Sequence, residues 1–129
     1  MASIEKFEDI EAWQKARELT REIYRVTNRG AFTKDFGLRD QIRRASVSIM
    51  SNIAEGFGRG GNREFIQFLS MAKGSVSEVQ AQLYVAVDVK YLTKDQFQQL
   101  YSLSQSTGNL IGGFIHYLTK SADKGVKFA

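Results

Sequence analysis

Apolar residues recur every three or four positions along almost the whole chain, and the sequence contains no proline to interrupt them. This spacing places apolar side chains on one face of an α-helix, and proline is the residue that most strongly breaks one. The alternating apolar and polar pattern of a half-buried strand is absent from the sequence. We therefore predict an all-α protein built from long helices.

Short breaks divide the periodic pattern into four segments. We expect their helices at about residues 7–29, 38–56, 63–90 and 94–119. Gly30 suits a helix end, Asn62 suits the N-cap of the third helix, and Thr93 with Gln96 matches a capping box that opens the fourth. Four helices of similar length joined by short loops predict an antiparallel up-down-up-down four-helix bundle.

The 129 residues are one domain's worth of chain. We expect this single bundle domain over residues 1–120 and a polar C-terminal tail over residues 121–129. The start of the chain is acidic and lacks the apolar core of a signal peptide. The most apolar stretch, Leu110 to Leu118, is too short to cross a bilayer, so we expect a cytoplasmic protein without a membrane partner.

The composition argues against catalysis. The chain has no cysteine and one histidine, which leaves no disulfide, thiolate nucleophile or multi-histidine metal site. The di-iron bundle motif would need an acid three residues before His116, where Gly113 stands. We predict no enzyme, no metal, no cofactor and no small-molecule substrate; an enzyme would need convergent groups such as Glu55, Glu64 and His116.

Glycine is concentrated between the second and third segments. Gly56 to Gly61 literally satisfies the dinucleotide-binding pattern G-x-G-x-x-G. That pattern binds a pyrophosphate only when a strand precedes it, and here a helix does. We interpret the string as a basic turn between helices. We also expect Glu55 or Glu64 to bridge between helices to Arg43, Arg44 or Arg63.

Basic residues are unevenly distributed. The chain holds 18 lysines and arginines against 14 acids, a net charge of +4. The window from Gln14 to Arg63 holds eleven basic and five acidic residues, a net +6 made mostly of arginine, whose planar fork of donors suits phosphate. The candidates for nucleic-acid binding are Arg17, Arg21, Arg25, Arg43, Arg44, Arg59 and Arg63. The alternative is that these arginines are used in ion pairs within and between subunits.

Several strings resemble one known family. They are Phe7 to Ala16, Phe36 to Leu38, Gln41 to Ile49 and the specific string Ser51 to Gly56, followed by shorter matches at Glu64–Phe65, Phe68–Leu69, Ala72–Ser75, Glu78 and Gln82–Leu83. Together they resemble the "four helix bundle" proteins, also called 23S rRNA intervening-sequence proteins. The resemblance covers roughly residues 7 to 118.

This resemblance implies a small bacterial cytosolic protein that forms a ring-like homopentamer. A relative, the accessory variability determinant of diversity-generating retroelements, engages nucleic acid through a basic barrel. Carried over by position, the signature residues are Asn52, Glu55, Gly56, Glu64, Gly74 and Ser75, which we interpret as structural. The sequence departs from the family at Met50 and Thr33, where proline is usual.

Two functional hypotheses follow. The first is a non-enzymatic, homo-oligomeric scaffold, expected as a pentameric ring, that contacts RNA, DNA or a nucleic-acid-bound protein through arginine. The second is a purely structural or protein-interaction module. Phosphate contacts without base reading would give binding that falls with salt and shows little sequence preference.

Overall fold

The computed structural model describes residues 4–123, with side chains through residue 121. Four α-helices make up most of it: α1 (Glu11–Thr27), α2 (Phe36–Gly58), α3 (Asn62–Asp88) and α4 (Lys94–Asp123). Two short 3-10 turns, η1 (Phe7–Asp9) and η2 (Gly30–Lys34), precede α1 and α2. The described residues include no strand, so the predicted all-α class is confirmed.

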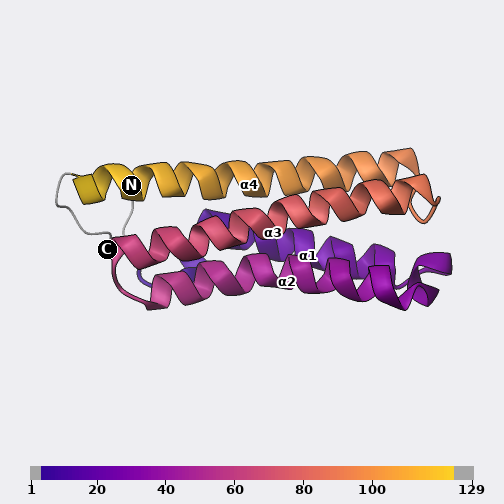
Figure 1. Cartoon of the computed structure of the whole chain (residues 1–129), viewed down its shortest axis with the longest axis horizontal. Coiled ribbons are helices and arrows are strands. Elements are labelled where there is room, and N and C mark those ends of the chain that lie inside the picture. Colours follow the sequence, from indigo (N-terminus) through magenta and orange to yellow (C-terminus); the bar gives the residue numbers. More distant parts are fainter. Residues whose placement is uncertain (1–3, 124–129) are drawn as a thin grey trace.

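The four helices lie side by side as a bundle (Figure 1). Short connections join consecutive helices at alternate ends, so neighbours run in opposite directions. Helix α1 packs against α2 and α4, and α3 packs against the same two helices. Pairs α1/α3 and α2/α4 are therefore the diagonals of an up-down-up-down bundle, and each helix presents one outer face.

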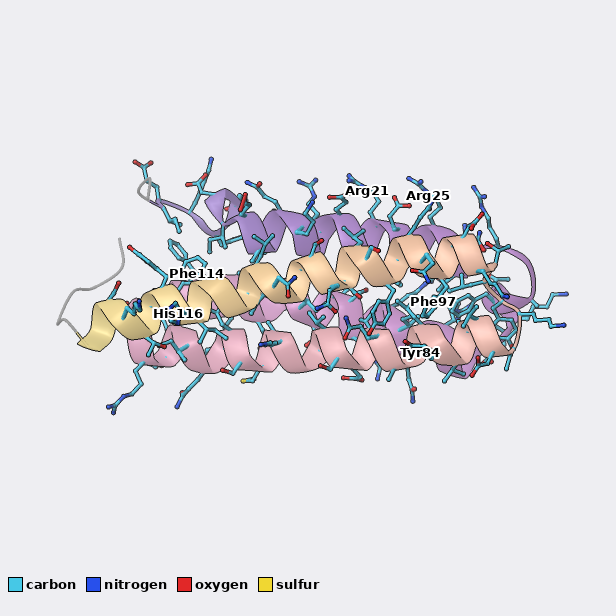
Figure 2. The ribbon with its side chains drawn as sticks, turned by 90° about the horizontal axis from the view of Figure 1, so that it is seen from above. Arg21, Arg25, Tyr84, Phe97, Phe114 and His116 are labelled. Carbon is cyan, nitrogen blue, oxygen red and sulfur yellow. The ribbon has the colours of Figure 1, made fainter. Side chains whose placement is uncertain are left out.

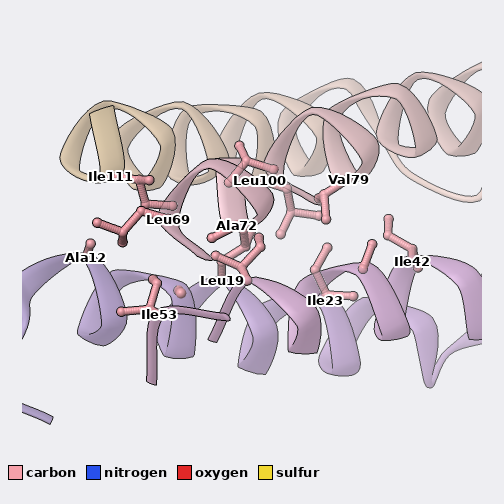
Figure 3. Packing of buried hydrophobic residues seen from close by; sticks show 14 of the residues in the cluster. Ala12, Leu19, Ile23, Ile42, Ile53, Leu69, Ala72, Val79, Leu100 and Ile111 are labelled. Carbon is pink, nitrogen blue, oxygen red and sulfur yellow. The ribbon is translucent and has the colours of Figure 1, made fainter. Parts of the chain in front are cut away.

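The core is the set of apolar side chains that the helical periodicity predicts (Figure 3). Leu19 and Ile23 of α1 meet Ile42 and Ile53 of α2, while Leu69 and Val79 of α3 and Leu100 and Ile111 of α4 close the core from the other side. All eight are buried. Their burial removes apolar surface from water, which is the main force that holds the helices together.

All helix bounds except the start of α4 differ from the expected ones, and three of the differences are informative. Ile10 has extended backbone angles, so residues 7–9 form a separate turn before α1. Helix α2 starts at Phe36 because the side chain of Asp35 accepts a hydrogen bond from the Leu38 amide. Helix α4 runs on to Asp123, and Ser121, which we placed in the tail, is helical and buried; the rest of the expected tail, 124–129, lies outside the described residues.

Capping was predicted correctly at one helix and wrongly at another. Thr93 and Gln96 exchange the two hydrogen bonds of a capping box, at 2.9 and 3.1 Å, as the sequence predicts. Asn62 is not an N-cap. It lies inside the first turn of α3, and its buried side chain donates to the Leu118 carbonyl of α4.

Met50 is one of the two positions at which the sequence departs from the family that it resembles. Helix α2 is continuous through this half-buried residue from Phe36 to Gly58. Methionine keeps the backbone donor that proline would remove, which allows an unbroken helix. Thr33, at the second departure, lies in η2, and its carbonyl accepts a hydrogen bond from Arg39.

Candidate nucleic-acid interface

The outer face of α1 carries a row of arginines. Arg17, Arg21 and Arg25 follow one another at every fourth position, and all three are exposed. In Figure 2, Arg21 and Arg25 project from α1 away from the other helices. Successive members lie about 6 Å apart along the helix axis.

Helix α2 adds two arginines, Arg43 on its flank toward α1 and Arg44 on its flank toward α3. Arg43 is half-buried against α1, where its Nε donates to Thr27 Oγ1 at 2.8 Å and its guanidinium lies 4.6 Å from the Tyr24 ring centroid. Arg44 is exposed and lines a hollow of about 410 Å³ together with Glu78 of α3. We call the five arginines that run from α1 across to the far flank of α2 the arginine face; they are Arg17, Arg21, Arg25, Arg43 and Arg44.

The two remaining candidates lie at the other end of the bundle. Arg59 follows the last residue of α2, and Arg63 lies in the first turn of α3. Sixteen residues of helix separate Arg43 from Arg59, or about 24 Å. The seven predicted arginines therefore form two separate groups.

Most of the arginine face is free of carboxylates. The ion pairs among residues 4–121 are Lys15–Glu18, Arg25–Glu22, Arg39–Asp40 and Arg59–Glu55, each between near neighbours in sequence. None of the four joins two helices. Arg17, Arg21 and Arg44 are in none of them.

The expected bridge from Glu55 or Glu64 to another helix is therefore wrong. Glu55 pairs with Arg59 one turn further along, at 3.1 Å, because that side chain lies on the same outer face. Glu64 lies exposed in the first turn of α3. Glu78 is fourteen residues, or about 21 Å, further along the same helix, so the two carboxylates do not converge on one site.

The other signature residues lie between α2 and α3 or on the surface of α3. Asn52 donates to the hydroxyl of Ser48, one turn before it on α2, and Ser75 of α3 donates to the same hydroxyl; both distances are 3.0 Å. This chain of polar groups fixes the register of the two helices.

The two signature glycines have different surroundings. Gly56 is buried against Phe65 and Phe68 of α3, whereas Gly74 is exposed and a Cβ there would meet nothing within 4 Å. Among the described residues, nothing therefore packs closely against Gly74.

Aromatic rings accompany the arginines where α1 meets α2 and at the start of α2 beyond the end of α1. Arg17 lies 5.8 Å from the centroid of the Trp13 ring, and Arg39 lies 4.7 Å from that of Phe36. Together with the pair of Arg43 and Tyr24 they form what we call the arginine–aromatic seam. We did not predict this seam, although the sequence shows Trp13 four residues before Arg17 and Phe36 three residues before Arg39. The pair of Arg43 and Tyr24 joins two helices, so no spacing in the sequence indicates it.

A long groove separates α1 from α4. Hollows of about 400, 590 and 640 Å³ follow one another along it, and neighbouring hollows share lining residues. The side of α1 contributes three acids and one base, which are Glu11, Glu18, Glu22 and Lys15. The side of α4 contributes uncharged residues such as Ser106. The groove therefore carries a net negative charge, whereas the arginine face carries a positive one.

The structure brings no catalytic constellation together in the part of the chain that it describes. His116 is exposed on α4 (Figure 2), and no group of three histidines, acids or cysteines among these residues could hold a metal. On the far side of the bundle, Tyr84, Phe97 and Tyr101 form an aromatic cluster between α3 and α4. Tyr101 beside it raises the pKa of Tyr84.

None of the helices over residues 4–123 is both long and apolar enough to cross a membrane. The longest, α4, has a polar outer face with glutamine, serine and asparagine side chains.

Comparison with known proteins identifies the family. The family model of the 23S rRNA-intervening sequence protein matches residues 8–113. The chain belongs to this family. Among solved structures, this member of the 23S rRNA-intervening sequence family is similar to a protein of unknown function from the S23 ribosomal protein family of Bacteroides thetaiotaomicron. The two are 24% identical over 81% of this chain and 97% of that one, with a TM-score of 0.73, which supports the fold.

No curated protein matches the chain. The resemblance predicted from the sequence strings is confirmed by the family match and by the four helices. Neither the family description nor the similar structure indicates a catalytic activity.

Proposed function

We propose that this protein is a non-catalytic, self-associating cytoplasmic scaffold that holds RNA or DNA by its phosphates through the arginine face. The observation that carries the proposal is the state of Arg17, Arg21 and Arg44. All three are exposed, and no ion pair within residues 4–121 engages them. Guanidinium groups in this state are free to bind phosphate oxygens.

The arrangement favours affinity over sequence reading. Arginines spaced along an exposed helix can follow a phosphate backbone. No hydrogen bond or ion pair among residues 4–121 fixes Arg17, Arg21 or Arg44 in a position suited to a base edge. We expect RNAs of unrelated sequence to bind with similar affinity. That affinity falls steeply with salt because each bound phosphate releases counterions.

The test is fluorescence anisotropy with two labelled single-stranded RNAs of unrelated sequence, measured between low and moderate salt. The variant Arg17→Gln/Arg21→Gln/Arg44→Gln should weaken binding of both RNAs and reduce the slope of log affinity against log salt by about 2, or 0.7 for each lost contact. The matched control is Lys73→Gln/Lys94→Gln/Lys120→Gln, which removes the same charge from α3 and α4.

The control should keep most of the wild-type affinity and slope. No binding by the wild-type protein even at low salt would overturn the proposal. An equal loss in the two triple variants would also overturn it, because net charge rather than the arginine face would then be responsible.

A protein-interaction module is the second candidate, and the groove between α1 and α4 favours it. The segment Gln96 to Thr119 contains no lysine, arginine or acid, an unusual stretch for the outer face of a helix and one suited to protein contact. Under this alternative the arginines pair with acids of neighbouring subunits. The triple arginine variant would then change the mass of the assembly rather than its affinity for RNA.

A further inference from the structure

The arginine–aromatic seam exposes rings that the bundle core does not use. Phe36 is 64% exposed and Tyr24 is 43% exposed, although both are large and apolar. Because these rings are exposed, another flat group can pack onto them, and every nucleic-acid base offers a flat face. Phosphate binding alone would not require these rings.

The rings and their arginines lie in two rows that meet at Tyr24 and Arg43. On α1, Trp13, Arg17 and Tyr24 share the side from which Thr20 donates to the Ser46 carbonyl of α2. On α2, Arg39 and Arg43 are one turn apart, and Arg43 covers the Tyr24 ring. The rows therefore meet along one line on the surface.

This line is long enough for several nucleotides. Trp13 and Tyr24 are eleven residues apart on α1, or about 16 Å, and Phe36 lies about 10 Å beyond Arg43 along α2. Each ring has a guanidinium stacked near it, at 5.8, 4.6 and 4.7 Å. A guanidinium plane is itself a surface on which bases stack while its donors reach a phosphate.

We propose that the seam binds single-stranded nucleic acid by stacking bases on Tyr24, Phe36 and the guanidinium planes beside them. In a duplex the base faces are already stacked inside the helix and only phosphates and edges remain available. The seam therefore distinguishes single strands from duplexes. The inference rests on the proposed binding of nucleic acid by the arginine face and assigns the strand state of the ligand.

The test compares a 15-nucleotide uridine-rich RNA, its DNA counterpart and a 15-base-pair RNA duplex. Trp13 is the only tryptophan, so its fluorescence reports on the seam directly. Both single strands should quench it and bind more tightly than the duplex. Tyr24→Ala and Phe36→Ala should each weaken single-strand binding about fivefold or more, the effect of losing one stacked base, and leave duplex binding unchanged.

The matched control is Tyr84→Ala, since Tyr84 is 51% exposed on α3, away from the seam. It should bind every probe as the wild type does. Circular dichroism of all three variants checks that they fold, as expected for exposed side chains.

The outcomes separate the two proposals. Salt-sensitive binding of single strand and duplex with equal affinity, unaffected by the ring variants, would overturn the stacking inference and leave the phosphate-binding proposal standing. A lower assembly mass in Tyr24→Ala or Phe36→Ala would overturn it as well, because the rings would then belong to a subunit contact. Absence of binding by any probe would overturn both.

Discussion

At the scale of single residues, Gly56 and Gly74 lie inside helices yet have opposite surroundings. A Cβ on Gly56 would lie 2.6 Å from Phe68 Cβ and 2.9 Å from Phe65 Cδ1. A Cβ on Gly74 would meet nothing within 4 Å. Glycine at position 56 therefore permits contact between α2 and α3, whereas at position 74 it gives no packing advantage within the chain and costs helix stability.

Substitution by alanine should consequently have opposite effects at these two positions. We expect Gly56→Ala to lower the free energy of unfolding by about 1–3 kcal/mol through overpacking. We expect Gly74→Ala to raise it by about 0.5–1 kcal/mol. Urea denaturation at one fixed protein concentration measures both. Unchanged stability of Gly56→Ala would contradict the close contact, and destabilisation by Gly74→Ala would mean that another subunit packs against Gly74.

Residue partners were the least predictable part of the molecule from sequence. Glu55 pairs with Arg59, four residues further along the chain, instead of forming the expected bridge to another helix. Asn62 has the right residue type for an N-cap, but it lies buried inside α3, where its side chain donates to the Leu118 carbonyl of α4. Both errors arise because residue type does not reveal which long-range partners the fold supplies.

At the scale of elements, Asp35 connects the start of α2 to the turn that follows α3. One of its carboxylate oxygens caps the Leu38 amide at 3.1 Å, and the other accepts a hydrogen bond from the Tyr91 hydroxyl at 2.9 Å. The sequence indicated a loop here but not the link, since Tyr91 is 56 positions away. Helix existence followed from periodicity, whereas the way helix ends are held depended on such distant contacts.

Removal of this link should destabilise the bundle. We expect Asp35→Ala to lower the free energy of unfolding by about 0.5–2 kcal/mol through loss of the cap. Asp35→Asn is the matched control, because asparagine caps as well as aspartate does and can still accept from Tyr91. Equal losses in the two variants, measured by thermal unfolding, would show that charge rather than capping matters.

Alkaline pH provides a second readout of the same link. The hydrogen bond to Asp35 raises the pKa of Tyr91 above its ordinary value of 10.0. The folded state thus favours the protonated phenol, and this stabilisation is complete below pH 10 and is lost as pH rises through the raised pKa. Asp35→Ala lacks this stabilisation at every pH. The difference in free energy of unfolding between the wild type and Asp35→Ala should therefore become smaller as pH rises through the raised pKa of Tyr91.

At the scale of the whole molecule, the bundle has faces of different chemistry. Arginines lie over α1 and α2, and acids line the α1 side of the groove toward α4. Helix α3 and the residue that follows it expose the apolar side chains Met71, Val85 and Val89. The sequence predicted the bundle and its arginine-rich half. It did not predict which arginines share a face, because that depends on how α1 and α2 rotate toward each other.

The apolar face of α3 is where we expect subunits to meet in the proposed ring. Light scattering should give a mass near five times the 14.6 kDa of the chain. Val85→Lys/Val89→Lys should lower the mass toward that of one chain without loss of helix, because charges buried in an interface without partners are costly. Val47→Lys is the matched control, since Val47 is exposed on α2 beside the arginine face and should leave the mass unchanged. A wild-type mass near 14.6 kDa would refute the ring, and an effect of Val47→Lys equal to that of the α3 variant would place the contact on the arginine face instead.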